Sequence, residues 1–367
     1  MTDEYYMQLA LGFARKGEGF VNPNPMVGAV IVKDNKIIGA GYHEKYGGPH
    51  AEPVAIASCF MPPDGAALYV TLEPCCHHGK TPPCVPAIIK SGIKKVIVGC
   101  LDPNPLVAGN GIDELRKSGA EVISGVLEEE CVKLNEVFFH YIKTGLPYVV
   151  MKYAMTMDGK IAAHTGKSKW ITGEAARHNV HQGRCRYTAV MAGVGTVIKD
   201  DPLLTCRIEN GRNPVRIICD TTLRTPLFSQ IVKTAGEVDT IIATACEDIE
   251  KQKPYIDAGC RVIAVSKKDG RIDLNKLMER LGKERIDSIL LEGGGELNWS
   301  ALNSGIVNKV QAYIAPKILG GKDAPSPVGG LGIDSPESAF CLTGSKIALF
   351  GEDILIESEV KPKCLPE

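Results

Sequence analysis

Hydrophobic positions in the first 145 residues switch repeatedly between helix-like and strand-like spacing. Apolar side chains recur at helical spacing in residues 4–16, and two β-branched runs flank the turn Asp34-Asn35-Lys36, which is typical of a β-hairpin. Strands are predicted at residues 26–33, 37–42, 67–72, 95–100 and 121–124, and helices at 4–16, from 50, at 83–90 and near 113–118. This alternation predicts a three-layer α/β/α arrangement around a mixed sheet.

A single amphipathic helix is predicted over residues 127–145, and it ends at a stop signal. Gly145 and Pro147 follow its last apolar positions, as at many helix C-termini. We place a domain boundary here, because a new set of strands and glycine loops begins directly afterwards. The sequence therefore predicts two domains, residues 1–145 and residues 146–367.

The second part of the chain has its own α/β alternation, without an internal repeat. A helix is predicted over residues 174–187. Strands are predicted at residues 148–155, 188–193, 215–219, 239–245, 261–265, 288–293, 309–315 and 353–358. No G-x-G-x-x-G motif opens a βαβ unit, so a Rossmann domain is not expected. The predicted fold class is α/β in both domains.

Composition and charge exclude several classes of protein. Hydrophobic residues make up 44% of the 367 residues, and 42 basic against 43 acidic residues give a net charge of −1. This balance lacks the basic excess of a nucleic-acid or membrane-surface protein, and no apolar run approaches the roughly 18 residues of a membrane span. The 13 cysteines, an odd number, favour free thiols or metal ligands in a reducing compartment. We expect a cytoplasmic protein that binds neither nucleic acid nor membrane.

The chemistry of the first domain centres on one histidine, one glutamate and two cysteines. His50 and Glu52 lie at the start of a predicted helix, Cys75 follows a strand, and Cys84 comes after a long insert. One imidazole and two thiolates leave the fourth position of a tetrahedral zinc ion open, as in catalytic zinc sites. A carboxylate beside the metal can move a proton between water and a leaving amine. The pattern predicts a zinc-dependent deaminase with Glu52 as the proton shuttle.

Other assignments of these residues stay open at this point. Three neighbours of Cys75 compete with Cys84 as the third ligand: Cys76, His77 and His78. We choose Cys84 because Pro82-Pro83 before it indicates a helix N-terminus, which favours a thiolate. A zinc-stabilised binding module without turnover is a further alternative, but structural zinc usually has four Cys or His ligands, and Glu52 would have no purpose there.

The chain resembles the bifunctional deaminase–reductase family of riboflavin biosynthesis over nearly its whole length. In the first domain the resemblance lies in the motifs PNPMVGAVIV, GYHEKYGGPHAE, TLEPCCHHGKTPPC and DPNPLVAGNGI. In the second it lies in MKYAMTMDGKIA, SKWITGEAAR, GVGTVIKDDPLLTCR, LEGGGEL and YIAPKILGG. The long insert between the two cysteines is far more specific than the His-x-Glu pair.

For the first domain, the resemblance implies a cytidine-deaminase-like fold with His50, Cys75 and Cys84 as zinc ligands. It implies release of ammonia from the 2-amino group of 2,5-diamino-6-(5-phosphoribosylamino)pyrimidin-4-one, which gives 5-amino-6-(5-phosphoribosylamino)uracil. Residues in matching motifs would line the substrate pocket: Asn24, His43, Lys80, Asp102 and Asn104. For each of these five the alternative is an ordinary turn or capping residue.

The second domain carries weaker signals of its own. Glu292 and three glycines lie between a predicted strand and a helix, where backbone amides can approach a phosphate. Such glycine loops are more often tight turns, so these residues alone indicate only a phosphate or nucleotide site.

For the second domain, the resemblance implies a dihydrofolate-reductase-like fold that uses NADPH to reduce the ribosyl group of the deaminated product to ribityl. Asp200 would supply a proton, with Asp201 as the adjacent alternative. The cofactor side would be Ala154, Trp170, Thr196, Asp200, Thr222, Gly293, Gly294 and Gly295. The substrate side would be Lys152, Ser168, Arg184, Leu204, Arg207 and Glu292, with both arginines on the phosphate. A core role is the alternative for Trp170, and NADPH over NADH rests on the resemblance alone.

A free nucleotide or an RNA base is the alternative substrate of the first domain. The balanced charge and the long cysteine spacing count against it. We therefore expect a small-molecule phosphoribosyl-pyrimidine substrate, zinc and NADPH as cofactors, and a homo-oligomer.

Overall fold

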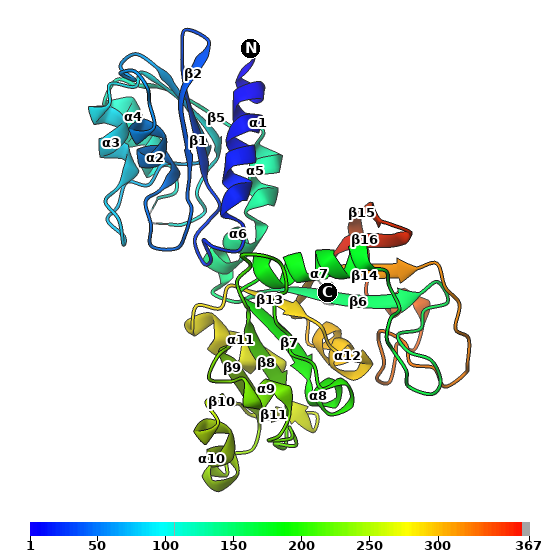
Figure 1. Cartoon of the computed structure of the whole chain (residues 1–367). Helices are drawn as coiled ribbons and strands as arrows, with labels where there is room; N and C mark the ends of the chain where they lie inside the picture. The colour runs from blue at the N-terminus through cyan, green and yellow to red at the C-terminus, as the bar shows by residue number, and fades with distance from the viewer. Residues whose placement is uncertain (106, 362–367) are drawn as a thin grey trace. The chain divides into compact units, whose positions relative to one another are not determined.

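The computed structural model describes residues 1–105 and 107–361, which fall into two compact units (Figure 1). Unit 1 comprises Met1–Gly145, and unit 2 begins at Leu146. Each unit has its own sheet and its own buried apolar clusters. Within the described ranges, no helix is both long enough and apolar enough to cross a membrane.

Unit 1 is built around a five-stranded mixed sheet with the order β2-β1-β3-β4-β5. The strands are β1 (Gly28–Lys33), β2 (Lys36–Tyr42), β3 (Ala67–Leu72), β4 (Lys95–Cys100) and β5 (Glu121–Ser124). Strand β1 pairs antiparallel with β2 and β3, whereas β3, β4 and β5 are parallel. Asp34 and Asn35 have φ angles of 51° and 59°, as the two-residue turn of a hairpin requires. The predicted hairpin and mixed sheet are confirmed.

Helices cover both faces of this sheet, with α1 and α5 on one face and α2, α3 and α4 on the other (Figure 1). The helices are α1 (Asp3–Ala14), α2 (Ala51–Ala57), α3 (Cys84–Lys90), α4 (Asn110–Lys117), α5 (Glu128–Leu134) and α6 (Glu136–Thr144). Ile31, Leu68 and Ile97, one from each of β1, β3 and β4, are fully buried between the layers. The predicted three-layer arrangement is therefore confirmed.

The single helix predicted over residues 127–145 is wrong, because the structure breaks it at Asn135 into α5 and α6. The Asn135 side chain is buried, and its Oδ1 accepts the Met26 N–H at 2.8 Å. Its Nδ2 donates to the Met26 carbonyl at 2.9 Å. Asn135 thus satisfies both backbone groups of a residue 109 positions away, and the pattern of apolar residues contains no signal of this tertiary contact.

Unit 2 contains a nine-stranded sheet with the order β10-β9-β8-β7-β13-β6-β14-β16-β15. Neighbours are parallel from β10 to β14, and β16 and β15 add antiparallel strands at one edge. The strands are β6 (Tyr148–Thr156), β7 (Ala189–Gly193), β8 (Val215–Cys219), β9 (Thr240–Thr244), β10 (Arg261–Ala264), β13 (Ser288–Leu291), β14 (Val307–Ala315), β15 (Leu342–Phe350) and β16 (Asp353–Val360). A separate small hairpin pairs β11 (Lys267–Lys268) with β12 (Arg271–Ile272).

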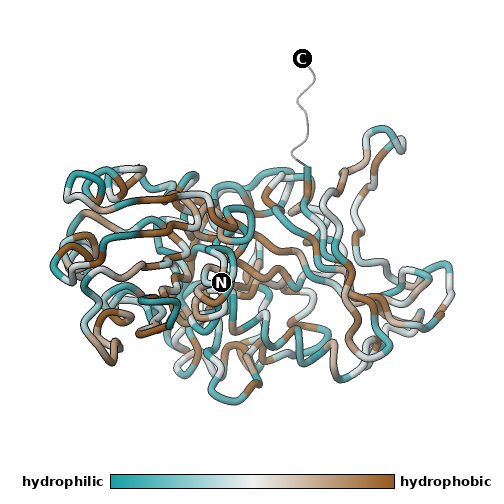
Figure 2. Tube along the Cα trace, turned by 90° about the horizontal axis from the view of Figure 1, so that it is seen from above, coloured by the Kyte–Doolittle hydropathy of each residue, from teal (hydrophilic) through white to brown (hydrophobic). Residues whose placement is uncertain are grey.

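Both faces of the central strands of unit 2 are buried. Ile217 and Ile218 are neighbours on β8 but belong to different apolar clusters, because successive side chains of a strand point to opposite faces. The helices of this unit are α7 (Glu174–Arg186), α8 (Val194–Asp200), α9 (Gln230–Lys233), α10 (Ile249–Asp257), α11 (Leu274–Lys283) and α12 (Gly295–Asn303). Figure 2 colours the trace of the chain by hydropathy, and hydrophobic stretches alternate with hydrophilic ones along it.

Strand β15 has no counterpart among the predicted elements. Most of its side chains are exposed, and Ile347 and Leu349 are each 71% exposed. Because neither face of β15 is buried, the strand lacks the alternation of apolar and polar residues on which a sequence-based prediction depends.

Candidate active sites

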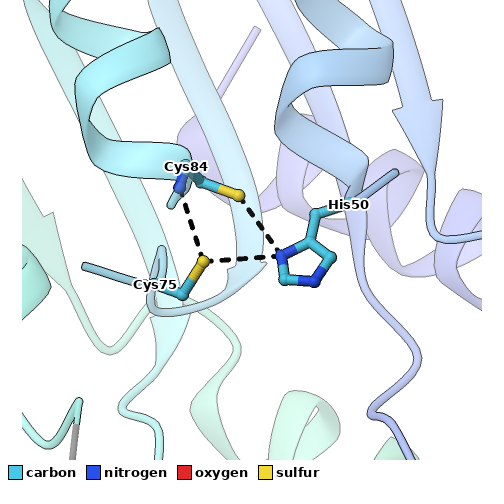
Figure 3. Close-up of side chains that lie close together, drawn as sticks. All are labelled: His50, Cys75 and Cys84. Carbon is cyan, nitrogen blue, oxygen red and sulfur yellow. Dashed lines mark hydrogen bonds between the residues drawn. The ribbon is translucent and has the colours of Figure 1, made fainter. Parts of the chain in front are cut away.

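Three side chains with zinc-binding atoms meet beyond the carboxyl end of β3 (Figure 3). His50 is the N-cap of α2, Cys75 lies three residues after β3, and Cys84 begins α3. Nδ1 of His50 lies 3.5 Å from Sγ of Cys75 and 3.3 Å from Sγ of Cys84. Zinc bonds of about 2.0–2.3 Å at tetrahedral angles would place nitrogen and sulfur ligands roughly 3.5 Å apart. The spacing and the chemistry of these three groups therefore fit a zinc ion.

The neighbours of the three ligands influence which ligand atoms carry a proton. Nε2 of His50 lies 3.3 Å from Oγ1 of Thr81, so a proton on Nε2 leaves Nδ1 free to face the metal. The Cys84 thiol and the His50 ring lower the pKa of Cys75 to about 4, against the effect of its burial. The pKa of Cys84 is raised by the neighbouring Cys75 and by burial. A bound dication would instead lower the pKa of Cys84, because it favours the thiolate form of this second cysteine.

Glu52 lies in the first turn of α2, beside the cluster, and is only 3% exposed. Burial, followed by the charge of Cys75, raises the pKa of Glu52 to about 7. A carboxyl group with such a pKa can both accept and release a proton near neutral pH.

The competing ligands considered above lie outside the cluster in the described part of the chain. The structure brings Cys84 to His50 and Cys75, whereas Cys76, His77 and His78 do not join them. Two further hydrogen bonds hold the pair of cysteines together, since the Cys84 N–H donates both to Sγ of Cys75 at 3.4 Å and to its carbonyl oxygen at 3.0 Å.

Two of the five predicted substrate residues of unit 1 contact one another next to the cluster. Nδ2 of Asn24 lies 3.1 Å from Nε2 of His43, and Nδ1 of His43 lies 2.9 Å from the Pro49 carbonyl. The His43 and His50 rings are 5.4 Å apart at their centroids. Burial lowers the pKa of His43, which favours a neutral ring that donates to Pro49 and accepts from Asn24.

The other three predicted substrate residues lie on loops. Nζ of Lys80 lies 3.9 Å from the centroid of the Tyr46 ring. Asp102 is buried after β4, and its Oδ1 accepts the Asn104 N–H at 2.8 Å, which is the turn contact given above as the alternative role. Burial raises the pKa of Asp102 to about 6.

A cavity of about 1400 Å³ lies in unit 2. This exceeds the roughly 300–1,000 Å³ usual for one small ligand, so it has room for a dinucleotide together with a sugar phosphate. All the predicted cofactor-side and substrate-side residues line it: Lys152, Ala154, Ser168, Trp170, Arg184, Thr196, Asp200, Leu204, Arg207, Thr222, Glu292, Gly293, Gly294 and Gly295. Trp170 is 60% exposed, which excludes the core role considered for it.

A compact group of charges lies in the wall of this cavity. Nε and Nη2 of Arg184, on α7, donate to the two oxygens of Glu292 at 2.6 and 3.1 Å, and Nζ of Lys152, on β6, lies 3.6 Å from the same carboxylate. Nη1 of Arg184 donates to the Thr205 carbonyl at 3.0 Å. Burial opposes the negative charge of Glu292, but Arg184 and Lys152 outweigh it and lower the pKa of Glu292 to about 2. Glu292 is thus ionised, and the fork of Arg184 is already occupied.

The two candidate proton donors of unit 2 differ in their contacts. Asp200 is the last residue of α8 and lines the cavity. Asp201 also lines it, but its Oδ1 accepts the Gln230 N–H at 2.8 Å, and its carbonyl accepts the Gln230 side chain at 2.9 Å. Asp201 therefore anchors the N-terminus of α9, which leaves Asp200 as the better candidate.

Two of the three glycines after β13, Gly293 and Gly295, allow close packing where α12 begins. A side chain at Gly293 would lie 2.7 Å from Oδ1 of Asn298, and one at Gly295 would lie 3.0 Å from backbone atoms of Ser326 and Gly329. All three glycines line the cavity, so the backbone of this turn, which packing keeps free of side chains at Gly293 and Gly295, faces the ligand space.

Sequence reasoning missed several polar residues that line the cavity or support the loops. His181, Lys199, Arg224 and Arg271 line the cavity of unit 2. Glu73 of unit 1 accepts four backbone hydrogen bonds. Glu73 lies inside the motif TLEPCCHHGKTPPC and Lys199 inside GVGTVIKDDPLLTCR, so membership of a family motif could have identified these two residues.

Two family models match the chain. The RibD C-terminal domain matches residues 147–356, and the cytidine and deoxycytidylate deaminase zinc-binding region matches residues 1–100. The chain is 54% identical to riboflavin biosynthesis protein RibD of Actinobacillus pleuropneumoniae over 97% of this chain and 95% of that protein. It is 45% identical to RibD of Aquifex aeolicus over 96% of this chain and 97% of that protein.

Solved structures give the same result. RibD of Acinetobacter baumannii superposes with a TM-score of 0.88 at 36% identity, covering 98% of this chain and 99% of that one. A diaminohydroxyphosphoribosylaminopyrimidine deaminase/5-amino-6-(5-phosphoribosylamino)uracil reductase of Thermotoga maritima superposes with a TM-score of 0.86 at 41% identity and the same coverage. The chain therefore belongs to the RibD family of riboflavin biosynthesis proteins, with a cytidine-deaminase-like N-terminal domain and a dihydrofolate-reductase-like C-terminal domain.

Proposed function

We propose that this chain deaminates 2,5-diamino-6-(5-phosphoribosylamino)pyrimidin-4-one and then reduces the ribosyl group of the product to ribityl. Residues 1–145 would carry the deaminase and residues 146–367 the reductase. The ligand cluster with the buried Glu52 carries the proposal, because its three ligands leave one zinc position open and place a proton shuttle beside it. The Thermotoga maritima relative, a deaminase/reductase of the same two activities, supports the proposal.

In the deaminase step, His50, Cys75 and Cys84 would hold zinc, which when bound supplies the Lewis acidity that yields hydroxide from water near neutral pH. Glu52 accepts the two water protons in turn and delivers one to the ring nitrogen and one to the 2-amino group, which leaves as ammonia while the water oxygen becomes the new carbonyl oxygen. Asn24 and His43 orient the pyrimidine, and their fixed hydrogen bond supports this role. We assign Lys80, Asp102 and Asn104 to the rest of the substrate.

In the reductase step, NADPH would lie along the cofactor-side residues named above and supply a hydride when bound. Asp200 gives the proton that the opening ribosyl ring needs. We expect the exposed Arg207 to supply most of the positive charge for the substrate phosphate, because Arg184 already gives its forked donors to Glu292. Lys152 and Glu292 orient the ribosyl group, and Ser168 and the Leu204 backbone complete the substrate side.

The experiment that tests the proposal follows ammonia and NADPH absorbance after the diaminopyrimidinone ribotide is added to purified protein. Ammonia release independent of NADPH, followed by NADPH oxidation only after deamination, is the expected result. Ammonia without oxidation would contradict the reductase assignment. If a zinc-loaded sample releases no ammonia, the proposed substrate is wrong, and free nucleotides would then be tested. Running the second step with NADH in place of NADPH tests the choice of cofactor.

We also expect a homo-oligomer in the cytoplasm. The exposed edge strand β15, with Ile347 and Leu349, supports the first expectation, because an open antiparallel edge can pair with its own copy across a two-fold axis. Sedimentation of the purified chain tests it. The cysteines of the described ranges form no disulfide, which supports a reducing compartment.

A further inference from the structure

A buried carboxylate that no step of the proposed reaction uses lies next to the zinc ligands. Glu73 follows β3 directly, two residues before Cys75, and is 3% exposed. Its backbone N–H donates to the Cys100 carbonyl at 3.0 Å, so the carboxyl ends of β3 and β4 are joined at this residue. The side chain then continues toward the loop that follows β4.

Both oxygens of Glu73 accept hydrogen bonds from backbone N–H groups of that loop and of α4. Oε2 accepts from Asp102 at 3.3 Å and from Gly109 at 3.0 Å, which are the two ends of the loop. Oε1 accepts from Gly111 at 3.0 Å and from Ile112 at 3.3 Å, in the first turn of α4. A charged acceptor makes each of these bonds stronger than a neutral one would.

Glu73 replaces a local helix cap. The N-cap of α4 is Gly109, which has no side chain to accept the first free N–H groups of the helix. The carboxylate of Glu73 does so from a position 36 residues earlier in the chain. Its negative charge also lies at the favourable end of the helix dipole.

The packing at Gly111 shows how closely α4 is held to the zinc-binding turn. A side chain at Gly111 would lie 2.1 Å from the Pro74 carbonyl oxygen and 3.3 Å from Oε1 of Glu73. The first turn of α4 thus rests directly against the residue that precedes Cys75.

We infer that Glu73 is a positioning residue for deamination, which fixes the loop bearing Asp102 and Asn104 relative to the zinc ligand Cys75. The Asp102–Asn104 contact places both side chains on one backbone turn, so an anchor on that backbone sets the position of both. The inference rests on the proposed function, because that proposal assigns the loop to substrate binding.

Steady-state deamination by the full chain with Glu73→Gln tests the inference. The amide keeps the size of the side chain but directs an NH₂ group at backbone donors, so the loop loses part of its anchor. We expect KM for the ribotide to rise about tenfold or more while kcat falls less than about threefold, because positioning acts on substrate binding. Zinc content and reduction of the separately supplied deaminated product should match the wild type. Glu73→Asp, which keeps both oxygens, should recover part of the loss.

Two further variants separate positioning from a general effect. Glu128→Gln removes an exposed acid from the first turn of α5 and should leave KM unchanged. Glu73→Gln combined with Asp102→Asn should lose less than the two single losses multiplied together, because one residue acts through the other.

Three results would overturn the inference. One is a Glu73→Gln KM within about twofold of the wild type, and another is full multiplicativity in the double variant. The third is a loss of zinc and heat stability that accounts for the lost activity, which would make Glu73 a purely structural residue. Wild-type protein that releases no ammonia would instead overturn the proposed function itself.

Discussion

The ionised Glu292 in the cavity of unit 2 makes a prediction about acid stability that can be worked out from its contacts. Its side chain is 11% exposed and pairs with Arg184 and Lys152, whose charges outweigh burial and lower the pKa of Glu292 from 4.5 to about 2. A carboxylate whose folded-state pKa is lowered stabilises the protein above its unfolded-state pKa, and this stabilisation is lost as the pH falls toward the folded-state value. The window is therefore from about pH 5 down to about pH 2.

The difference between the folded-state and unfolded-state pKa of Glu292 sets the size of this stabilisation. A lowering from 4.5 to about 2 corresponds to about 3 kcal/mol of folding free energy at pH 6. At pH 3 the same relation leaves about 1.4 kcal/mol, so about 2 kcal/mol is lost between these two pH values. Glu292→Gln removes this pH-dependent contribution. At neutral pH the variant is also destabilised by about 3 kcal/mol or more, because Lys152 and Arg184 remain buried without a counter-charge.

Urea unfolding followed by tryptophan fluorescence at a series of pH values measures the effect. Both tryptophans of the chain, Trp170 and Trp299, lie in unit 2, so the signal reports on that unit. The difference between the wild type and Glu292→Gln should shrink by about 2 kcal/mol from pH 6 to pH 3. Glu296→Gln, which breaks the exposed pair with Arg271, is the control, and its difference should change by less than about 1 kcal/mol. A wild-type-to-Glu292→Gln difference that is independent of pH would refute the reasoning.

Three further predictions concern the two reactions. Glu52→Gln should keep one zinc per chain but lower deamination by about 10²- to 10⁴-fold, because the ligands remain while the proton shuttle is lost; a zinc-loaded variant with undiminished ammonia release would contradict the role. Cys84→Ala should lower the zinc content measured by elemental analysis, and an unchanged content would move the third ligand to a neighbour such as Cys76. Asp200→Asn should slow NADPH oxidation by about 100-fold and leave ammonia release intact, because deamination does not use this group; a parallel fall of both activities would show that the two sites are coupled.

Elements whose signal is local in the chain could be predicted from the sequence. The hairpin at Asp34-Asn35 needs only two residues that tolerate positive φ between two β-branched runs. The positions of His50 and Cys84 follow from helix starts, which short polar and proline patterns mark. The family motifs then supplied the cavity-lining residues of unit 2, which no local pattern distinguishes from ordinary turns.

Features that depend on partners far away in the chain could not be predicted. The break at Asn135 depends on Met26, and the ionised state of Glu292 depends on Arg184, 108 residues earlier. The exposed strand β15 was not predicted for a different reason, because its pairing with β16, rather than a buried face, makes it a strand. The first two are tertiary interactions between single residues and the third is a strand without a buried face, and hydrophobic periodicity detects neither kind of feature.

The four hydrogen bonds on Glu73 have a consequence for how this gene can vary. All four donors are backbone N–H groups, which every amino acid except proline provides. Substitutions of the donor residues therefore leave the anchor intact, provided that no proline replaces a donor, Gly111 stays small and Gly109, which has a φ of 89°, stays glycine. Tolerance of substitution at the other donors is thus combined with sensitivity at Glu73 and at the two glycines, and a saturation scan scored on riboflavin prototrophy should reveal this asymmetry.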